Sequence, residues 1–196
     1  MKMECSWPGN NQLMRMYHNE EWCVPTTDDQ YIFEMLTLEG AQAGLSWSIV
    51  LSKREAYQKA FHNFDIRFCS DLTDNDLTNI KENYNVIKHL AKLQSVRSNA
   101  QAVIKITKEF GSFSNFLWRY VDFEPIINDW HSEGQIPTQT DLSNQISKDL
   151  KKRGFKFVGP VTMYSFMQAI GMVDDHVTSC VYHTSNKERK IKENGF

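Results

Sequence analysis

The chain has 196 residues, of which 41% are hydrophobic and 23% charged, a composition typical of one globular domain with a single core. No apolar run is long enough to cross a bilayer, and the first residues lack a secretory signal, so we expect no membrane contact and a cytoplasmic location. The net charge of −2 does not by itself indicate a nucleic-acid-binding protein. Basic residues nevertheless gather at 148–156 and 187–192, a pattern compatible with DNA binding but also with a solvated helix face and a frayed tail.

Helical signals occur along most of the chain, and strand-like alternation is nearly absent. Thr27 or Asp28 can cap a first helix, and Ser46 is placed to begin the next. Thr73 with Asp76 resembles a capping box at the start of another. Gly111 and Gly171 are placed to end two more helices. The predicted helices span about residues 27–43, 46–61, 74–83, 87–110, 113–121, 141–153 and 160–170, with 122–140 as a loop. The sequence therefore predicts a single all-α domain.

Cysteine and histidine side chains indicate a possible metal site. Without a secretory signal, disulfides are disfavoured, which leaves metal ligation or inert burial for Cys5, Cys23, Cys69 and Cys180. Cys5 and His18 lie near one end of the chain. His176 and Cys180 form an H-x-x-x-C pair near the other end, presented by one helical face or by a tight turn. Two thiolates and two imidazoles would complete a closed, structural zinc site, but four unrelated residues are the alternative, and Cys23 is a competing ligand.

Glu39 is the most informative single side chain. It lies on the apolar face of its predicted helix, together with Met35 and Leu36, and therefore points inward. A buried carboxylate without a partner is costly, so it needs a partner, a proton or a function. Together with the rings of Tyr17 and Trp47, it predicts a pocket for a flat, polar or cationic heterocycle. The alternative is a core glutamate bonded to a helix end, with the aromatic rings as packing.

No motif for nucleophilic catalysis is present. The chain has neither a Gly-x-Ser-x-Gly elbow nor a glycine-rich phosphate loop.

Two long blocks of the sequence carry a family resemblance. The first comprises YHNEEW at 17–22 and LTLEGAQAGLSW at 36–47, and the second KKRGFKFVGPVTMYSFMQ at 151–168 with GMVDDH at 171–176. Both resemble bacterial DNA-3-methyladenine glycosylase I, and the similarity covers about residues 4–183.

The resemblance implies a helix-hairpin-helix fold and an activity in base-excision repair. It implies a glycosylase domain over 1–183, with the hairpin motif at about 74–106, and a basic tail over 184–196. The expected reaction is hydrolysis of the N-glycosidic bond of 3-methyladenine in alkylated double-stranded DNA. Free 3-methyladenine would be released without strand cleavage, by a monomer in the bacterial cytosol that holds one structural zinc.

The resemblance also assigns roles to individual residues. Zinc ligation falls on Cys5, His18, His176 and Cys180. The catalytic or orienting residues are Glu39 and Tyr17, and the base-binding residues are Trp47, Trp7, Tyr17 and Glu39. The DNA-contacting residues would be Gly44, Leu45 and Asn85. The turn at 43–45 would fill the gap left by an extruded nucleotide.

Several residues depart from the family pattern. Met14 replaces a usual second pocket tyrosine, and Cys23 and Asn85 replace glycines; asparagine tolerates left-handed backbone better than most residues do. Leu90 replaces a basic residue and Asp174 an asparagine. Met14 and Leu90 motivate a second hypothesis, a zinc-stapled scaffold that binds damaged DNA or methylated bases with weak or no turnover. A third hypothesis is a zinc-stabilised interaction domain with no nucleic-acid role.

Overall fold

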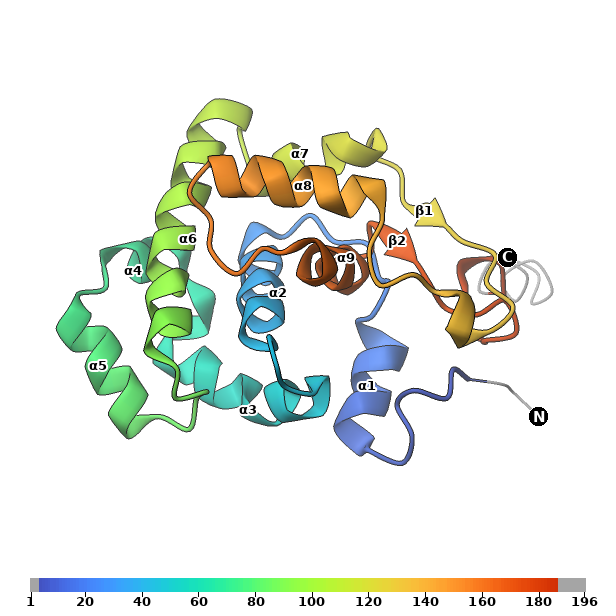
Figure 1. The fold of residues 1–196 in the computed structure, drawn as a ribbon, viewed down its shortest axis with the longest axis horizontal. Coiled ribbons are helices and arrows are strands. Elements are labelled where there is room, and N and C mark those ends of the chain that lie inside the picture. Colours follow the sequence, from blue (N-terminus) through green and yellow to red (C-terminus); the bar gives the residue numbers. More distant parts are fainter. Residues whose placement is uncertain (1–3, 187–196) are drawn as a thin grey trace, which may run out of the picture.

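The structure, a computed structural model, describes residues 4–186 and confirms the all-α prediction (Figure 1). Within this range the helices are α1 (Gln12–Glu20), α2 (Asp29–Ala41), α3 (Trp47–Ala60), α4 (Ile66–Asp71), α5 (Asp74–Asn83), α6 (Leu90–Phe110), α7 (Phe113–Trp118), α8 (Asp141–Lys152) and α9 (Pro160–Ala169). The fold also contains short 3₁₀ segments at His62–Phe64, Arg119–Val121 and Glu133–Gln135. Two short strands are β1 (Ile126–Ile127) and β2 (Val173–Asp174). Most of the predicted basic tail, residues 187–196, lies outside the described residues.

Apart from the start of α6, the predicted helix starts agree with the structure in position. The capping box is confirmed, because Thr73 Oγ1 accepts from the Asp76 backbone N–H and Asp76 Oδ2 accepts from the Thr73 N–H at 2.8 Å. Asp28 rather than Thr27 caps α2, accepting two backbone N–H groups. Ser46 stands at the start of α3, but its hydroxyl bonds a neighbouring serine at 2.9 Å and makes no cap.

The sequence analysis missed α1 and α4 and misplaced the start of α6. In α1 only Tyr17 and His18 are buried, so no apolar stripe marks the helix. The long helix begins at Leu90 rather than near 87, because the His89 side chain caps it by accepting from a backbone N–H. The segment predicted as a loop at 122–140 contains β1, which pairs in parallel with β2 far along the chain.

Helix α2 forms the centre of the core. Residues 32–41 of this helix are all buried, which is the pattern of a helix surrounded by others. Helices α3, α6, α7 and α9 pack against it, and Figure 1 shows α2 between α6, α9 and α1. Glu39 is thus carried by a helix that other helices cover on several sides. None of the helices within residues 4–186 has both the length and the apolar character needed to cross a membrane.

Gly171 allows the chain to pass close to another segment. It adopts φ +72°, and a Cβ atom there would collide with the backbone of Val24 and Pro25. We expect Gly171→Ala to lower the free energy of unfolding by more than about 2 kcal/mol, measured by denaturant titration. Gly134→Ala is the matched control, because its Cβ would meet no atom within 4 Å. Equal losses in the two variants would contradict this account of Gly171.

Candidate active site

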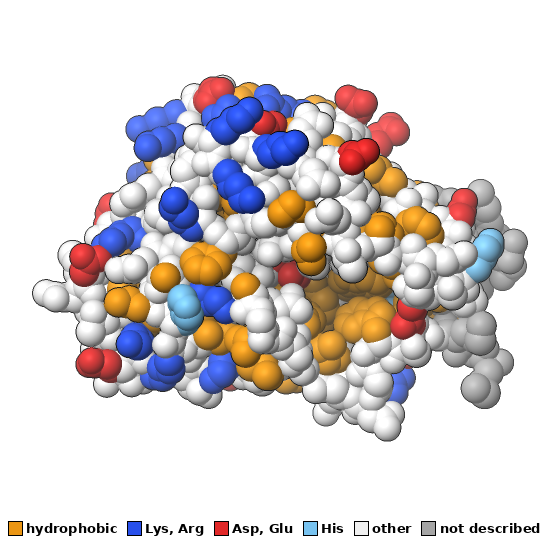
Figure 2. Space-filling model, viewed as in Figure 1, with side chains coloured by type: hydrophobic (Ala, Val, Ile, Leu, Met, Phe, Trp, Pro, Cys, Tyr) orange, Lys and Arg blue, Asp and Glu red, His pale blue; other side chains and the backbone are white. Residues whose placement is uncertain are grey.

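A cavity of about 240 Å³ opens where α1, α2, α3 and α9 meet. Figure 2 shows a hollow lined with hydrophobic side chains at this place. Its lining consists of Trp7, Tyr17, Trp22, Glu39, Gln42, Trp47, Ile136, Ser165 and Gln168. The four residues for which base contacts were predicted are all in this set. Sequence reasoning missed Trp22, Gln42, Ser165 and Gln168, although they lie within or beside the family-like blocks, and Ile136 carries no local signal.

Unpartnered polar atoms distinguish this cavity from others of similar size. Within residues 4–186, six buried side-chain nitrogen or oxygen atoms have no hydrogen-bond partner. Four of them belong to residues of this cavity: Trp7 Nε1, Tyr17 OH, Glu39 Oε2 and Trp47 Nε1. The hollow of about 290 Å³ lined by Pro25 and Tyr31 contains none. Because each buried unsatisfied group costs about 1–3 kcal/mol, their convergence indicates that the cavity is built for a ligand.

Among residues 4–186, no group forms a hydrogen bond with Glu39 Oε2. Glu39 is 5% exposed, and burial raises its pKa to about 8. Burial, and then the nearby Glu39 charge, raise the pKa of Tyr17 well above its usual value. The shift in the pKa of Glu39 favours its protonated form near neutral pH. A cationic ligand would favour the ionised carboxylate, because opposite charges at short range lower the pKa of an acid.

Aromatic rings from separate segments form the cavity walls. Tyr17 and Trp47 lie with their ring centroids 5.2 Å apart and their planes tilted by 57°. Trp7 and Trp22 meet edge to face at 5.1 Å. Met14, at the position where the family usually has a second pocket tyrosine, packs against the core and is not among the lining residues.

Cys5, His18 and Cys180 form a buried group beside the cavity. One possible ligand atom from each lies within 4.8 Å of the others. Cys180 Sγ is 3.8 Å from His18 Nε2, and a hydrogen bond from the Cys5 thiol lowers the pKa of Cys180. Two thiols and one imidazole in a buried cluster are suitable ligands for a metal ion. The structure thus brings together three of the four predicted ligands.

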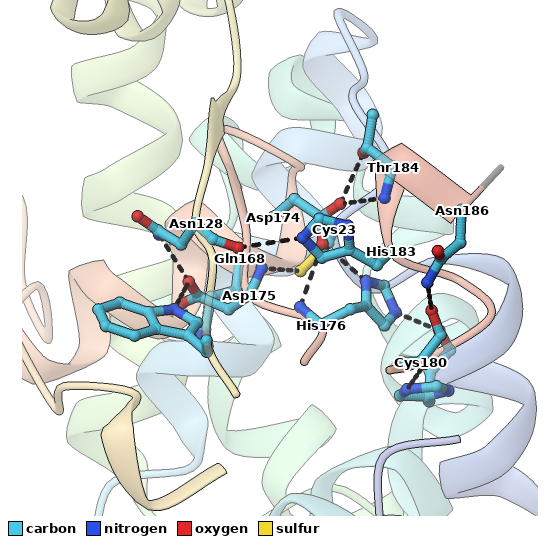
Figure 3. A network of polar contacts seen from close by, with 12 residues as sticks. Cys23, Asn128, Gln168, Asp174, Asp175, His176, Cys180, His183, Thr184 and Asn186 are labelled. Atoms are coloured by element: carbon cyan, nitrogen blue, oxygen red, sulfur yellow. Dashed lines mark hydrogen bonds and ion pairs between the residues drawn. The ribbon is translucent and has the colours of Figure 1, made fainter. Parts of the chain in front are cut away.

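His176, the predicted fourth ligand, is not part of this group, whose ligand atoms all lie within 4.8 Å of one another. A turn rather than a helix presents it, and its Nδ1 bonds Asp174 Oδ1 at 2.8 Å (Figure 3). Its Nε2 lies 3.4 Å from the His18 carbonyl oxygen, and the two imidazole centroids are 4.8 Å apart. A histidine that bonds a carboxylate through one nitrogen has its other nitrogen oriented for a metal.

A second group contains Cys23, the competing ligand, with Asp174 and His176. Its members already have protein partners. Asp174 Oδ2 accepts from the Thr184 backbone N–H at 2.8 Å and from the Thr184 hydroxyl, and Cys23 Sγ accepts from a backbone N–H at 3.3 Å (Figure 3). In the first group His18 Nδ1 bonds Asn19 Oδ1 at 2.6 Å, which leaves His18 Nε2 facing the Cys180 sulfur at 3.8 Å. The first group is therefore a candidate metal site.

Aromatic contacts join this metal-ligand group to the cavity. Trp22 stacks on His18 at 5.8 Å and meets His176 edge to face at 4.8 Å. The ring centroids of Trp7 and His18 are 5.4 Å apart, and the cavity residue Tyr17 precedes His18 on α1. Trp7 and Trp22 therefore contact both this group and the interior of the cavity.

A family model described as methyladenine glycosylase matches residues 7–183. This chain belongs to the methyladenine glycosylase family. The DNA-3-methyladenine glycosylase of Haemophilus influenzae is 44% identical over 185 residues, which cover 94% of this chain and 100% of that protein. A crystal structure of 3-methyladenine DNA glycosylase I matches with a TM-score of 0.90 and 45% identity, covering 92% and 100% of the two chains. The Staphylococcus aureus enzyme, solved to show the structural basis of 3-methyladenine recognition, matches at 0.89 and 37%, covering 92% and 96%.

In this methyladenine glycosylase family member, the turn between α2 and α3 forms the rim of the cavity. Gln42 before the turn and Trp47 after it both line the cavity. Gly44 adopts φ +80°, a conformation that favours glycine, and Leu45 presents an apolar side chain that is 38% exposed. The predicted DNA-contacting residues Gly44 and Leu45 therefore lie at the entrance to the cavity.

The family resemblance places a DNA-binding hairpin between α5 and α6. Asn85 is exposed there and is not among the described residues with positive φ, so the turn does not use the left-handed backbone that asparagine tolerates. Its side chain instead accepts from Lys53 Nζ at 2.7 Å, which shapes the turn by a contact with α3. Lys88 Nζ donates to three carbonyl oxygens at the end of α5. Leu90 is 38% exposed and supplies no charge.

Basic side chains lie on the same face as the cavity. Figure 2 shows Lys and Arg side chains gathered over α6 and α8 beside the hollow. The exposed lysines of the cluster predicted at 148–156 are Lys148, Lys151, Lys152 and Lys156. Arg153 is held by an ion pair with Glu109 at 2.7 Å. The positive charge is thus local, which reconciles a binding face for a polyanion with the overall charge of −2.

Proposed function

We propose that this protein excises 3-methyladenine from alkylated double-stranded DNA. The observation that carries the proposal is the buried, unpartnered Glu39 Oε2 in an aromatic cavity of about 240 Å³. Family membership and the names of the relatives support the same activity. Methylation at N3 makes the adenine of DNA cationic, so an acidic, aromatic pocket would select it over neutral adenine.

The geometry supports hydrolysis with little acid–base chemistry. A nucleotide extruded from the duplex would place its base between Trp47 and Tyr17. Glu39 would accept a hydrogen bond from the exocyclic amine and stabilise the positive charge. The glycosidic bond of the cationic base is already weak, so binding and orientation are the main contributions of Glu39 and Tyr17. The cavity lining contains no lysine that could form an imine, which favours base release without strand cleavage.

DNA contacts are proposed at two places on the cavity face. The turn that carries Gly44 and Leu45 would occupy the gap left by the extruded nucleotide. Backbone amides and Asn85 at the α5–α6 hairpin would hold phosphates, since hairpin amides and helix N-termini bind anions without requiring a basic protein. We further propose that the domain acts as a monomer in the bacterial cytosol.

We propose that the metal is a single structural zinc. Cys5, His18 and Cys180 supply three ligands, and the fourth is His176 Nε2, with Asp174 orienting the ring from its other side. Four protein ligands leave no open position, so the ion would stabilise the fold and take no part in the reaction. It would tie the segments before α1 and after β2 together.

The proposed activity is tested directly with methylated DNA. The purified protein is incubated with methylated duplex DNA, free bases are separated by chromatography, and strand integrity is followed on a denaturing gel. We expect release of 3-methyladenine and intact strands. Tight binding without base release would favour the scaffold hypothesis, and absence of both binding and release would refute the proposed function.

Trp47 is expected to provide a stacking surface for the base. Trp47→Ala should weaken binding of free 3-methyladenine by about 1–3 kcal/mol, because base–aromatic stacking is lost. Quenching of tryptophan fluorescence or calorimetry measures the Kd. Trp47→Phe keeps a ring in the wall and is the matched variant, with a much smaller effect. An unchanged Kd in Trp47→Ala would exclude Trp47 from the binding surface.

A further inference from the structure

Helix α6 carries a buried lysine to which the proposed function assigns no role. Lys92 lies in the first turn of α6 and is 9% exposed. Its Nζ donates to the carbonyl oxygens of Ala41 and Ala43, each at 2.8 Å. Within residues 4–186 no carboxylate forms an ion pair with it. The ammonium group is thus directed at the C-terminal end of α2, where the helix dipole favours a cation.

The carbonyls that Lys92 binds lie where α2 runs into the rim of the cavity. Between them, the Gln42 carbonyl accepts from the Leu45 N–H, so three successive carbonyl groups are satisfied, two of them by Lys92. Residues 43–46 are otherwise exposed. Ser46 is bonded to the first turn of α3. Among the hydrogen bonds within residues 4–186, those from Lys92 tie the turn to a helix other than α2 and α3, which flank it. The position of the 43–45 turn therefore depends on the position of Lys92.

The other side of Lys92 is attached to the hairpin. Its backbone N–H donates to the His89 carbonyl oxygen at 3.0 Å and lies 3.4 Å from His89 Nδ1, the group that caps α6. His89 is exposed and ends the segment that joins α5 to α6. One residue thus connects the hairpin, through its backbone, to the rim of the cavity, through its side chain.

We propose that Lys92 is a positioning residue that couples the seating of the hairpin on DNA to the placement of the 43–45 turn at the cavity mouth. The inference rests on the proposed excision from duplex DNA. Because the turn is flanked by two lining residues, Gln42 and Trp47, a small displacement changes how an extruded nucleotide enters. Misplacement by about 1 Å can reduce a rate by about 100-fold. A free base that diffuses into the cavity does not need the turn.

Lys92→Met tests the coupling, because methionine keeps most of the side-chain length and removes the ammonium group. We expect single-turnover excision from methylated duplex DNA to fall by at least about tenfold. Excision from the single-stranded form, which needs no extrusion, should fall by less than about threefold. The Kd of free 3-methyladenine should stay within about twofold of the wild-type value. Lys59→Met removes an exposed lysine of α3 and is the charge-matched control, expected to match the wild type throughout.

Two results would overturn the coupling: duplex excision that is unchanged in Lys92→Met, or equal losses for duplex, single strand and free base. The latter would mean that Lys92 supports the whole cavity. If Lys92→Met does not fold, Lys92→Gln is measured in the same way, since it keeps one donor but cannot reach both carbonyls. In a Leu45→Ala background, Lys92→Met should cost much less, because both changes act through the turn. A wild-type protein that releases no base would instead refute the proposed function itself.

Discussion

Glu39→Gln is expected to make the protein more stable and nearly inactive. Excision should fall by about 100-fold, because a charge-assisted hydrogen bond to the cationic base is worth up to about 3 kcal/mol. The substitution keeps the shape of the side chain, so the cavity should persist. Free-base release from methylated duplex DNA measures the activity. Retention of wild-type activity would exclude Glu39 from lesion recognition.

The stability gain follows from the direction of the pKa shift. Burial raises the pKa of Glu39 from 4.5 to about 8, so between these values the folded state holds a proton that the unfolded state has released. The wild-type free energy of unfolding therefore falls as pH rises through this range and levels off above it. Near pH 7 the raised pKa of Glu39 costs the wild-type fold about 3 kcal/mol. The gain in Glu39→Gln is smaller than this by the cost of burying the unpartnered amide of glutamine. The advantage of Glu39→Gln should accordingly grow from pH 5 to pH 8.

Glu34→Gln is the matched control on the same helix. Glu34 is also buried, but its carboxylate pairs with Arg54 at 2.8 Å and accepts from Gln58. Its replacement should lower stability by about 1–3 kcal/mol, since a buried ion pair is broken, and leave excision near the wild-type rate. Denaturant titrations of both variants at several pH values give the comparison. Loss of stability in Glu39→Gln would show that its carboxylate has a structural partner.

Removal of the proposed zinc ion is expected to have the largest effect on stability. Chelation, or Cys180→Ser, should lower the free energy of unfolding by at least about 3 kcal/mol, because the ion joins segments that are distant in sequence. It should also weaken binding of 3-methyladenine, since Trp22 and Trp7 pack on His18 and line the cavity. Metal analysis, thermal unfolding and the Kd of the free base are the measurements.

His176→Ala tests whether His176 is the fourth zinc ligand, and Cys69→Ser is the control. His176→Ala should reduce zinc content and thermal stability together. Cys69 is buried on α4, and its Sγ lies 3.7 Å from the Phe61 carbonyl oxygen, away from the metal ligands. Cys69→Ser should cost some stability but leave the metal stoichiometry unchanged. A protein that holds no zinc before chelation, or unchanged zinc in Cys180→Ser, would contradict the proposed site.

Features that depend on short sequence separations were accessible from the sequence. The cap at Asp28, the box at Thr73 and the helix-ending Gly111 involve groups within a few residues of one another, and they define helices correctly without tertiary information. The inward direction of Glu39 follows from helical periodicity in the same way. The family resemblance rests on long, nearly gapless blocks, so the fold class and the kind of pocket could be stated in advance.

Only the tertiary structure decided which distant side chains share the site. Ile136 joins the cavity wall from a loop, Trp22 lies between the cavity and the metal ligands, and Lys92 reaches carbonyl groups on another helix. The orientation of His176 toward Asp174 is likewise a tertiary contact that spacing does not encode. Local rules describe backbone geometry over one helical turn. A cavity, in contrast, exists where several elements fail to fill the space between them, and that depends on the packing of the whole chain.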